Sequence, residues 1–186
     1  MSKEQDYYHS LYQVAKVINS SLEPAQVLET IAAQVVQSMD LKACSLRLLD
    51  STGQRLLIGA SHGLSKGYLR KGTVEVEKSR LDQEALSGKT VLVQDARSDS
   101  RFQYPEQAKE EGLVSLLVLP LMVEDRAIGV LRAYSGENRE FTAEEIELLH
   151  IIANLSAIAL ENAKLHQRLK LDCQLQEEYD YRLFED

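Results

Sequence analysis

The chain has 186 residues, of which 44% are hydrophobic and 27% are charged, and this composition is typical of one folded domain with appended segments. Its formal net charge of -8 at pH 7 and its pI near 5.1 give a field that repels phosphate backbones and anionic lipid head groups. Nucleic acid and anionic membrane surfaces are therefore not expected as partners.

Two helices are predicted at the start of the chain. The apolar residues of the first follow at intervals of four, three and four residues: Tyr7, Leu11, Val14 and Ile18. This spacing places them on one stripe of coiled-coil width, which needs a partner helix. Pro24 suits the first turn of a second helix, over residues 24–39, because its missing N–H would have no partner there.

The middle of the chain alternates short apolar segments with polar turns, a pattern typical of strands. The turn at residues 50–53 predicts a hairpin between the first two segments. Residues 59–72 have the composition of an irregular connection. The predicted strands are residues 43–49, 55–60, 90–93, 113–123 and 127–134.

Two short helices are predicted between these strands, and a long one follows them. Residues 79–86 and 105–111 are followed by Gly88 and by Gly112 in the left-handed cap position. Residues 95–104 form a polar loop between them.

The long helix begins at Thr142, because Glu145 three positions later completes a capping box. Its seam continues at heptad-like spacing, with Asn162 as a polar member. The apolar seam residues are Leu148, Ile151, Leu155, Ile158, Leu165 and Leu169. We expect this helix to leave the domain and to pair with another helix.

Several phrases of the sequence, taken in order, resemble the GAF domain family. They are LEP at 22–24, ACSLRLLD at 43–50, LSGKTVLVQD at 86–95, GLVSLLVLPL at 112–121, AIGVL at 127–131 and FT at 141–142. The resemblance implies an α+β, GAF/PAS-like fold. In this fold a central antiparallel sheet has the N- and C-terminal helices on one face and a ligand pocket, roofed by short helices and loops, on the other.

The same resemblance divides the chain into three parts. Residues 1–21 are expected to form a dimerisation helix, residues 22–164 the GAF domain, and residues 165–186 an extension of the C-terminal signalling helix.

Strand alternation places polar side chains together on one face of the expected sheet. Ser45 and Arg47 share a face of their strand, as do Arg132 and Tyr134 of theirs. Two arginine side chains would present planar donors suited to carboxylate or phosphate. The alternative is that the two arginines sit at strand ends, where they pair with acidic residues or with water.

The resemblance adds positions to this set. In GAF domains that bind cyclic nucleotides, the positions that resemble Ser45, His62, Leu81 and Arg132 line the ligand, and the segment from Asp95 closes over it. A haem ligand and an ordinary loop histidine are the alternatives for His62. The candidate ligand-binding residues are Ser45, Arg47, His62, Leu81, Asp95, Arg97, Phe102, Ser115, Arg132 and Tyr134.

The sequence departs from the motifs of known GAF domains, and these departures reduce the number of cofactors to consider. Residues 138–145 keep a phenylalanine but lack the lysine and aspartate of the Asn-Lys-Phe-Asp-Glu set found in cyclic-nucleotide phosphodiesterases, so a cyclic nucleotide lacks motif support. No cysteine lies near residues 104–111, where a covalent bilin would attach. Cys44 has no neighbouring cysteine of the kind that sulfoxide reductases use. The cofactor therefore remains unknown.

Other features argue against export and metal binding. The longest apolar run, residues 113–123, contains a proline and is too short to cross a bilayer as a helix. The N-terminus lacks the pattern of a signal peptide. Cys44 and Cys173 lie far apart without metal-ligand spacing. We expect a cytoplasmic protein without a metal site.

These observations predict a sensory or regulatory module in signal transduction and no enzyme. A small polar or anionic ligand would bind non-covalently, and the C-terminal helix would relay its presence. The alternative is a ligand-free dimerisation or interaction module whose pocket is filled by its own side chains. The expected partners are a second copy, joined through residues 7–18 and 148–169, and a separate effector protein. The first helix either joins a parallel bundle with that copy or folds back on the last helix.

Overall fold

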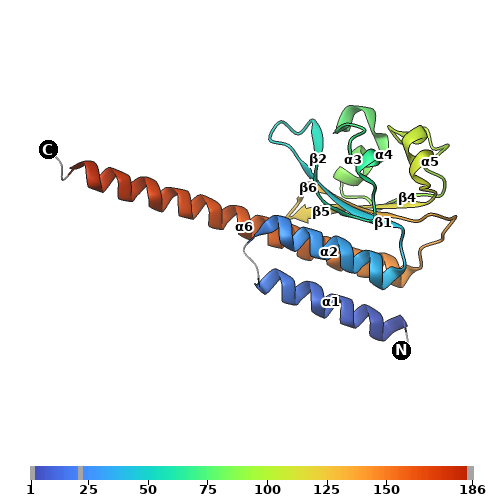
Figure 1. Ribbon diagram of the computed structural model, residues 1–186, viewed down its shortest axis with the longest axis horizontal. Coiled ribbons are helices and arrows are strands. Elements are labelled where there is room, and N and C mark those ends of the chain that lie inside the picture. Colours follow the sequence, from blue (N-terminus) through green and yellow to red (C-terminus); the bar gives the residue numbers. More distant parts are fainter. Residues whose placement is uncertain (1–2, 21–22, 184–186) are drawn as a thin grey trace.

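The computed structural model describes residues 3–20 and 23–183 of the chain. It is layered: an antiparallel sheet lies between short helices on one face, here the front face, and long helices on the other, the back face (Figure 1). The predicted α+β fold is confirmed. The parts of the predicted segments that fall on residues 1–2, 21–22 and 184–186 lie outside the described residues.

Five of the six described strands follow the predicted alternation of apolar segments and turns, and the short strand at Val74–Glu75 was not predicted. Their bounds are β1 Ala43–Leu49, β2 Arg55–His62, β3 Val74–Glu75, β4 Val91–Val93, β5 Leu116–Val123 and β6 Arg126–Tyr134. The order across the sheet is β3-β2-β1-β6-β5-β4, and each neighbouring pair is antiparallel. The strand that was predicted at residues 113–123 starts three residues later than expected, at Leu116.

Three long helices cover the back face. They are α1 Lys3–Ser20, α2 Pro24–Met39 and α6 Ala143–Leu183. Helices α2 and α6 lie against the sheet, and α1 lies on them on the side away from the sheet (Figure 1). Leu28 of α2 and Ile152 of α6 share one buried core with Leu119 of β5. Because each helix presents an apolar stripe, this layer buries the back face of the sheet.

The apolar stripe of α1 packs within the same chain. Val14 is fully buried, and Tyr7, Leu11 and Ile18 are partly buried against the core of α2 and α6. In this structure the first helix therefore folds back on the last helix of the same chain.

Short elements cover the front face. They are α3 Lys66–Leu69, the 3-10 turn η1 Val76–Lys78, α4 Arg80–Leu86 and α5 Pro105–Glu111. A second buried cluster, which includes Leu56, Leu81 and Leu116, fills the space between them and the sheet. The segment expected to be irregular thus contains α3, which begins where the Ser65 hydroxyl accepts a hydrogen bond from the backbone of Tyr68 at 3.1 Å.

The predicted capping box at the start of α6 is confirmed. Thr142 N donates to Glu145 Oε2 at 3.1 Å, and Glu145 N donates to Thr142 Oγ1 at 3.2 Å. Glu145 is buried, and its Oε1 accepts a hydrogen bond from Arg139 Nη2 at 2.8 Å. Arg139 Nη1 also donates to the carbonyl of Asp40 at 3.2 Å, which ties the start of α6 to the end of α2.

Both predicted glycine caps are also present. Gly88 follows α4 with φ +88° and Gly112 follows α5 with φ +70°. Because these left-handed conformations suit glycine, each helix turns directly into the segment that leads to the next strand.

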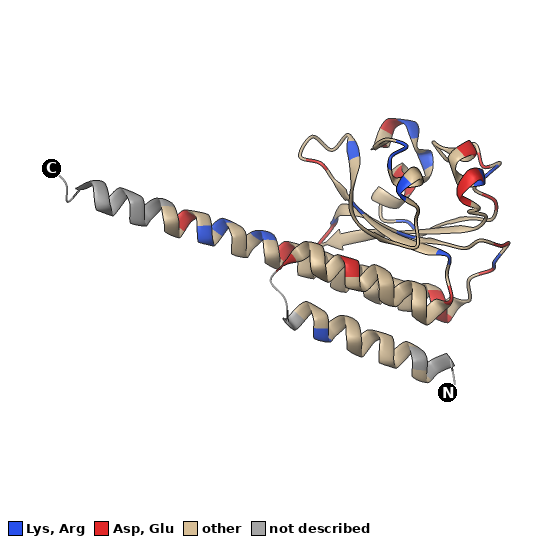
Figure 2. Cartoon of the chain, in the orientation of Figure 1, with Lys and Arg blue, Asp and Glu red and all other residues tan. Residues whose placement is uncertain are grey.

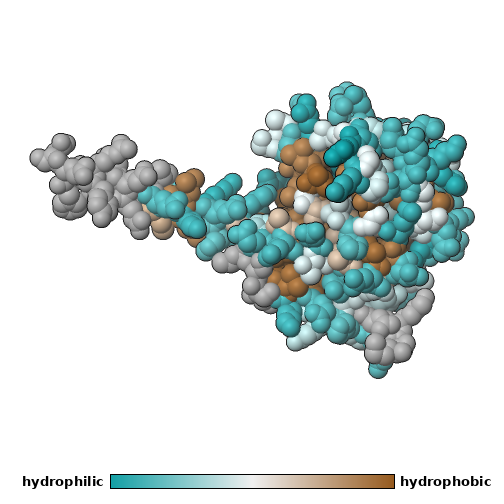
Figure 3. All heavy atoms as spheres, viewed as in Figure 1, coloured by the Kyte–Doolittle hydropathy of each residue, from teal (hydrophilic) through white to brown (hydrophobic). Residues whose placement is uncertain are grey.

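The C-terminal half of α6 projects beyond the domain (Figure 1). It carries side chains of both charges (Figure 2) together with exposed apolar ones, which form a brown patch on the projecting helix (Figure 3). Among the side chains of α6 whose burial is described, the large exposed apolar ones are Ile151, Ile158, Leu165, Leu169 and Leu171. Within residues 3–20 and 23–183, no helix is long and apolar enough to span a membrane.

Candidate functional site

The central strands bring polar side chains together on the front face. In the register of β1 and β6, Ser45 is opposite Arg132, Arg47 is opposite Val130 and Ala43 is opposite Tyr134. Opposed residues point to the same face of a sheet, so all these side chains face the short helices. Ser45, Arg47 and Arg132 are buried there, which is unusual for polar groups and requires partners.

Arg132 has its partner on helix α4. Its Nε donates to Asp82 Oδ1 at 3.2 Å, and its Nη2 pairs with Asp82 Oδ2. Ser79 Oγ donates to the same carboxylate at 2.5 Å. Burial alone would lower the pKa of Arg132, but the charge of Asp82 outweighs it and raises that pKa. Arg132 therefore remains charged, and its contact with Asp82 joins α4 to the sheet.

Aromatic side chains surround this pair. The Phe102 ring lies 5.8 Å from the guanidinium carbon of Arg132. Tyr134 OH and Ser45 Oγ share a hydrogen bond of 3.2 Å, and the Tyr134 ring meets the Tyr68 ring of α3 edge to face, with their centroids 6.4 Å apart. Tyr68 and Phe102 thus add aromatic contacts between the front elements and the polar face of the sheet, beside the contact of Asp82 with Arg132.

Arg47 differs from Arg132 because no carboxylate pairs with it. Its side chain is 3% exposed, and its Nε is buried without a hydrogen-bond partner. The Tyr68 hydroxyl is also buried without a partner. A buried donor without an acceptor costs about 1–3 kcal/mol, and more when the donor is charged. A buried guanidinium Nε without an acceptor therefore needs an explanation.

Lys71 is a third polar group without an acceptor. Its Nζ is buried, makes no hydrogen bond, and lies 3.1 Å from the centroid of the Tyr68 ring. Burial, the largest cause, and the nearby charges of Arg47 and Arg132 lower the pKa of Lys71 to about 6. The neutral amine of Lys71 is therefore the main form near neutral pH.

We call this group of side chains the front cluster. It consists of Ser45, Arg47, Tyr68, Lys71, Leu81, Asp82, Phe102, Arg132 and Tyr134. Six of the ten residues expected from the sequence belong to it: Ser45, Arg47, Leu81, Phe102, Arg132 and Tyr134.

The structure does not bring three of the other expected residues to the front cluster. His62, at the end of β2, is exposed and pairs in register with Cys44, whose side chain faces the back core. Asp95 and Arg97 bind each other on an exposed loop, with Arg97 Nε 2.7 Å from Asp95 Oδ1. The hydrogen bond from Arg97 lowers the pKa of Asp95 to about 2. Their charges are satisfied by one another, which leaves neither free for the front cluster.

Ser115 has a structural role immediately before β5. Its hydroxyl donates to the carbonyl of Gln94 at 2.9 Å and accepts from the backbone N–H of Arg139 at 3.0 Å. It therefore holds the connection to α6 against the strand edge instead of joining the front cluster.

Three members of the front cluster were not expected from the sequence. Asp82 lies three residues after Ser79, a spacing that signals a helix start but not a partner for a distant arginine. Tyr68 and Lys71 come from the segment expected to be irregular, where no periodicity indicates which side chains face inward. Only the tertiary structure identifies them.

Cys44 lies away from the front cluster. It is fully buried on the back face, and burial raises the pKa of its thiol. A raised pKa disfavours the thiolate, which is the reactive form. Among the residues that the structure describes, no group of three or more His, Cys, Asp or Glu side chains is placed to hold a metal ion.

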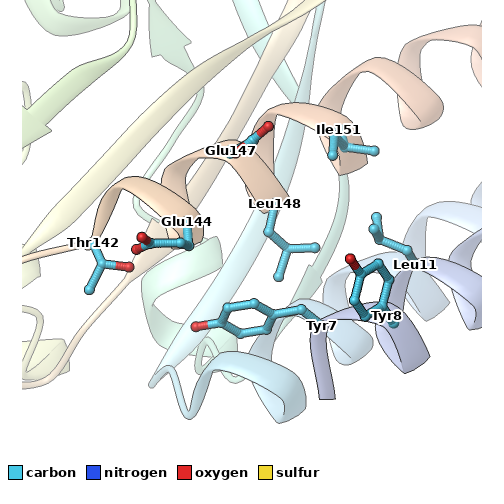
Figure 4. Close-up of a pocket in the computed structure, with 8 residues that line it drawn as sticks. All are labelled: Tyr7, Tyr8, Leu11, Thr142, Glu144, Glu147, Leu148 and Ile151. Carbon is cyan, nitrogen blue, oxygen red and sulfur yellow. The ribbon is translucent and has the colours of Figure 1, made fainter. Parts of the chain in front are cut away.

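A separate groove of about 590 Å³ lies on the back side, between α1 and α6 (Figure 4). Its lining combines apolar and acidic side chains: Tyr7, Tyr8, Leu11, Thr142, Glu144, Glu147, Leu148 and Ile151. It contains none of the expected ligand-binding residues, and the sheet separates it from the front cluster.

The front cluster combines buried donors that lack acceptors, Arg47 Nε, Lys71 Nζ and the Tyr68 hydroxyl, with aromatic and apolar walls. An antiparallel sheet with long helices behind it and short helices over the front cluster is the arrangement that the resemblance to GAF domains implied.

The comparisons with known proteins identify the family. The GAF domain profile matches residues 21–161, and the chain belongs to the GAF domain family. The GAF domain of a phosphoenolpyruvate-protein phosphotransferase from Coxiella burnetii is similar in structure, with a TM-score of 0.79 at 18% identity over 90% of this chain and 99% of that one. The corresponding Acinetobacter domain has a TM-score of 0.73 at 24% identity and covers 89% and 97% of the two chains.

A relative in sequence is the formate hydrogenlyase transcriptional activator of Escherichia coli. It is 24% identical over 176 residues, which cover 91% of this chain and 25% of that protein. The chain thus spans about a quarter of the length of this curated relative. GAF domains in such proteins are regulatory modules.

Proposed function

We propose that this GAF domain binds a small molecule carrying a carboxylate or phosphate group, non-covalently, in the front cluster, and that binding changes the packing of α6. The observation that carries the proposal is Arg47, a residue 3% exposed whose buried Nε has no acceptor. The role of the domain is then to regulate a partner, whether part of a longer chain or a separate effector protein.

The position of Arg47 suits an oxyanion ligand. A guanidinium presents planar donors that match two oxygens of a carboxylate or phosphate, and such charge-assisted hydrogen bonds are the strong ones. The only carboxylate that pairs with an arginine in the described front cluster, Asp82, is taken by Arg132. A bound oxyanion would supply the missing acceptor for Arg47 without competing for Asp82.

The sheet offers a route from ligand to helix. β6 places Arg132 and Tyr134 on the front face, and the alternating residues Leu131 and Ala133 in the back core that contains α6. His150 of α6 also shares a hydrogen bond of 2.7 Å with Thr90, next to β4. A shift of the front elements would thus reach α6 through the strands and through this contact.

Thermal unfolding of the full chain tests the proposal. Acetate, pyruvate, inorganic phosphate and glycerol 3-phosphate would be compared with chloride at equal ionic strength. A ligand at 100 times its Kd adds about 2.7 kcal/mol of stability, which is roughly 5–10 °C for a domain of this size. We expect at least one probe to stabilise the wild type and the control Arg55→Met, but not Arg47→Met. Equal behaviour of all three proteins with every probe would contradict the proposal.

A second candidate function is dimerisation without a ligand. Two observations favour it: Lys71 and Tyr68 fill the front cluster with the protein's own side chains, and the projecting α6 exposes an apolar stripe. Ile151, Ile158 and Leu165 recur every seven residues along that stripe, the spacing of a coiled-coil seam. A second copy of this chain would cover it, and the two functions are compatible in one protein.

A further inference from the structure

Two donors beside Arg47 come from the segment after β2 and not from the sheet. Lys71 Nζ and the Tyr68 hydroxyl are both buried without hydrogen-bond partners. Lys71 Nζ lies 3.1 Å from the centroid of the Tyr68 ring and 5.4 Å from that of the Tyr104 ring. A ring face attracts an ammonium group but does not replace the three hydrogen bonds that the group makes in water.

The acceptors near this point are already engaged. Asp82 pairs with Arg132, and Glu111 accepts hydrogen bonds from the residue that caps α3. Arg47 Nε and the two donors from this segment therefore lack an acceptor among the described side chains. An oxyanion would supply that acceptor.

We infer that Lys71 and Tyr68 complete an oxyanion site whose fixed side is Arg47, and this inference rests on the proposed function. An oxyanion that reaches Arg47 accepts hydrogen bonds from all three side chains, and the Lys71 amine leaves the face of the Tyr68 ring to meet it. Lys71 is then the group that occupies the ligand's place when no ligand is bound.

Binding of the ligand is coupled to protonation of Lys71. Burial, assisted by Arg47 and Arg132, lowers the pKa of Lys71 to about 6, and the acidic groups Glu111 and Asp82 oppose this shift only in part. A bound oxyanion favours the ammonium form and raises that pKa. Between about pH 6 and the raised value, binding therefore takes up a proton, and affinity falls roughly tenfold for each unit of pH.

The aromatic neighbours do not supply a competing charge. Burial, together with the neighbouring Tyr134, raises the pKa of Tyr68. Tyr68 therefore remains a neutral phenol near neutral pH and acts toward an oxyanion as a hydrogen-bond donor. The Tyr104 hydroxyl donates to the carbonyl of Thr73 at 2.8 Å, so its proton is engaged elsewhere.

The test follows the Lys71 amine directly, by NMR of the full chain labelled with carbon-13 at the lysine Cε. The resonance that disappears in Lys71→Arg identifies the residue. The probes are sodium pyruvate and inorganic phosphate, which separate a carboxylate ligand from a phosphate ligand. Without a probe the midpoint of the titration lies near pH 6, and with a saturating probe we expect it to rise by about one unit or more.

Binding to variants completes the test. Lys71→Met is expected to weaken binding of the effective probe roughly tenfold or more at about pH 6. Lys71→Arg should bind pyruvate with an affinity that is independent of pH, because neither an arginine nor the carboxylate of pyruvate titrates in this range. Tyr68→Phe should also weaken binding, whereas the exposed controls Lys89→Met and Tyr12→Phe should not.

The outcomes separate the two proposals. If a probe stabilises the wild type but binds Lys71→Met equally well and leaves the Lys71 titration unchanged, the inference about Lys71 is wrong while the proposed function stands. If neither pyruvate nor phosphate binds the wild type, the proposed function fails, and the inference fails with it.

Discussion

Asp82 accepts hydrogen bonds from Nε and from Nη2 of Arg132, across the contact between α4 and β6. The two side chains are 0% and 2% exposed. This pair gives the two arginines of the front face, Arg47 on β1 and Arg132 on β6, different roles. Arg132 holds a front helix to the sheet, and Arg47 remains the arginine whose buried Nε has no acceptor.

Asp82→Asn is expected to destabilise the domain. It leaves the buried Arg132 charge without compensation, and removing one partner of such a pair costs about 3–5 kcal/mol. Urea unfolding of the full chain measures the loss. Glu75→Gln breaks the exposed pair with Lys78 and should cost no more than about 1 kcal/mol. Similar losses for both variants would show that Asp82 does not carry the contact.

Arg47→Met is expected to stabilise the ligand-free domain. The substitution removes a buried donor that has no acceptor, a cost of about 1–3 kcal/mol, and keeps an apolar chain of similar length. Chemical unfolding without added anions measures the gain, and the exposed Arg55→Met should change stability by less than about 0.5 kcal/mol. A destabilised Arg47→Met would mean that the guanidinium has a structural partner within the protein.

Lys71→Met is expected to change how stability depends on pH. The pKa of Lys71 is lowered in the folded protein to about 6, so the unfolded chain binds more protons at this residue between about pH 6 and 10. The cost of burying Lys71 is therefore complete below about pH 6 and disappears as the pH rises toward 10.

The stability gained by Lys71→Met should accordingly be largest near pH 6 and smaller near pH 9. Thermal unfolding at both values measures it, with Lys89→Met as the exposed control. A gain of the same size at both pH values would contradict the lowered pKa.

Ile158→Glu tests the second candidate function. Ile158 is 51% exposed on α6, so a charge there leaves the core intact but would place like charges in the seam of a dimer. Light scattering should show a dimer for the wild type and a monomer for the variant, with unchanged circular dichroism. A monomeric wild type would remove this function. Gln167→Glu, an exposed position on the opposite side of α6 from Ile158, serves as the control.

Local sequence signals predicted most of the fold. The spacing of Thr142 and Glu145 and the positions of Gly88 and Gly112 act within a few residues of the chain, and the structure contains all of these caps. Alternation along the strands likewise predicted that Ser45 and Arg47 share a face. These features depend on local backbone geometry, which the sequence determines directly.

The partners within the site depend on distant parts of the chain. Asp82 and Arg132 are 50 positions apart, and no local pattern relates them. Lys71 follows a four-residue helix whose orientation is set by tertiary contacts, including the hydrogen bond between Glu111 and the hydroxyl of Ser65 at 2.5 Å. Periodicity cannot predict which side chains of such a segment point inward.

A crystal structure of the full chain grown with the stabilising anion tests the central claim most directly. The account predicts an oxyanion at hydrogen-bond distance from Arg47 Nε, about 2.7–2.9 Å, with Lys71 Nζ moved off the Tyr68 ring to contact it. A structure in which Arg47 pairs with a carboxylate of the protein, and the anion lies elsewhere while Lys71 stays on Tyr68, would contradict it.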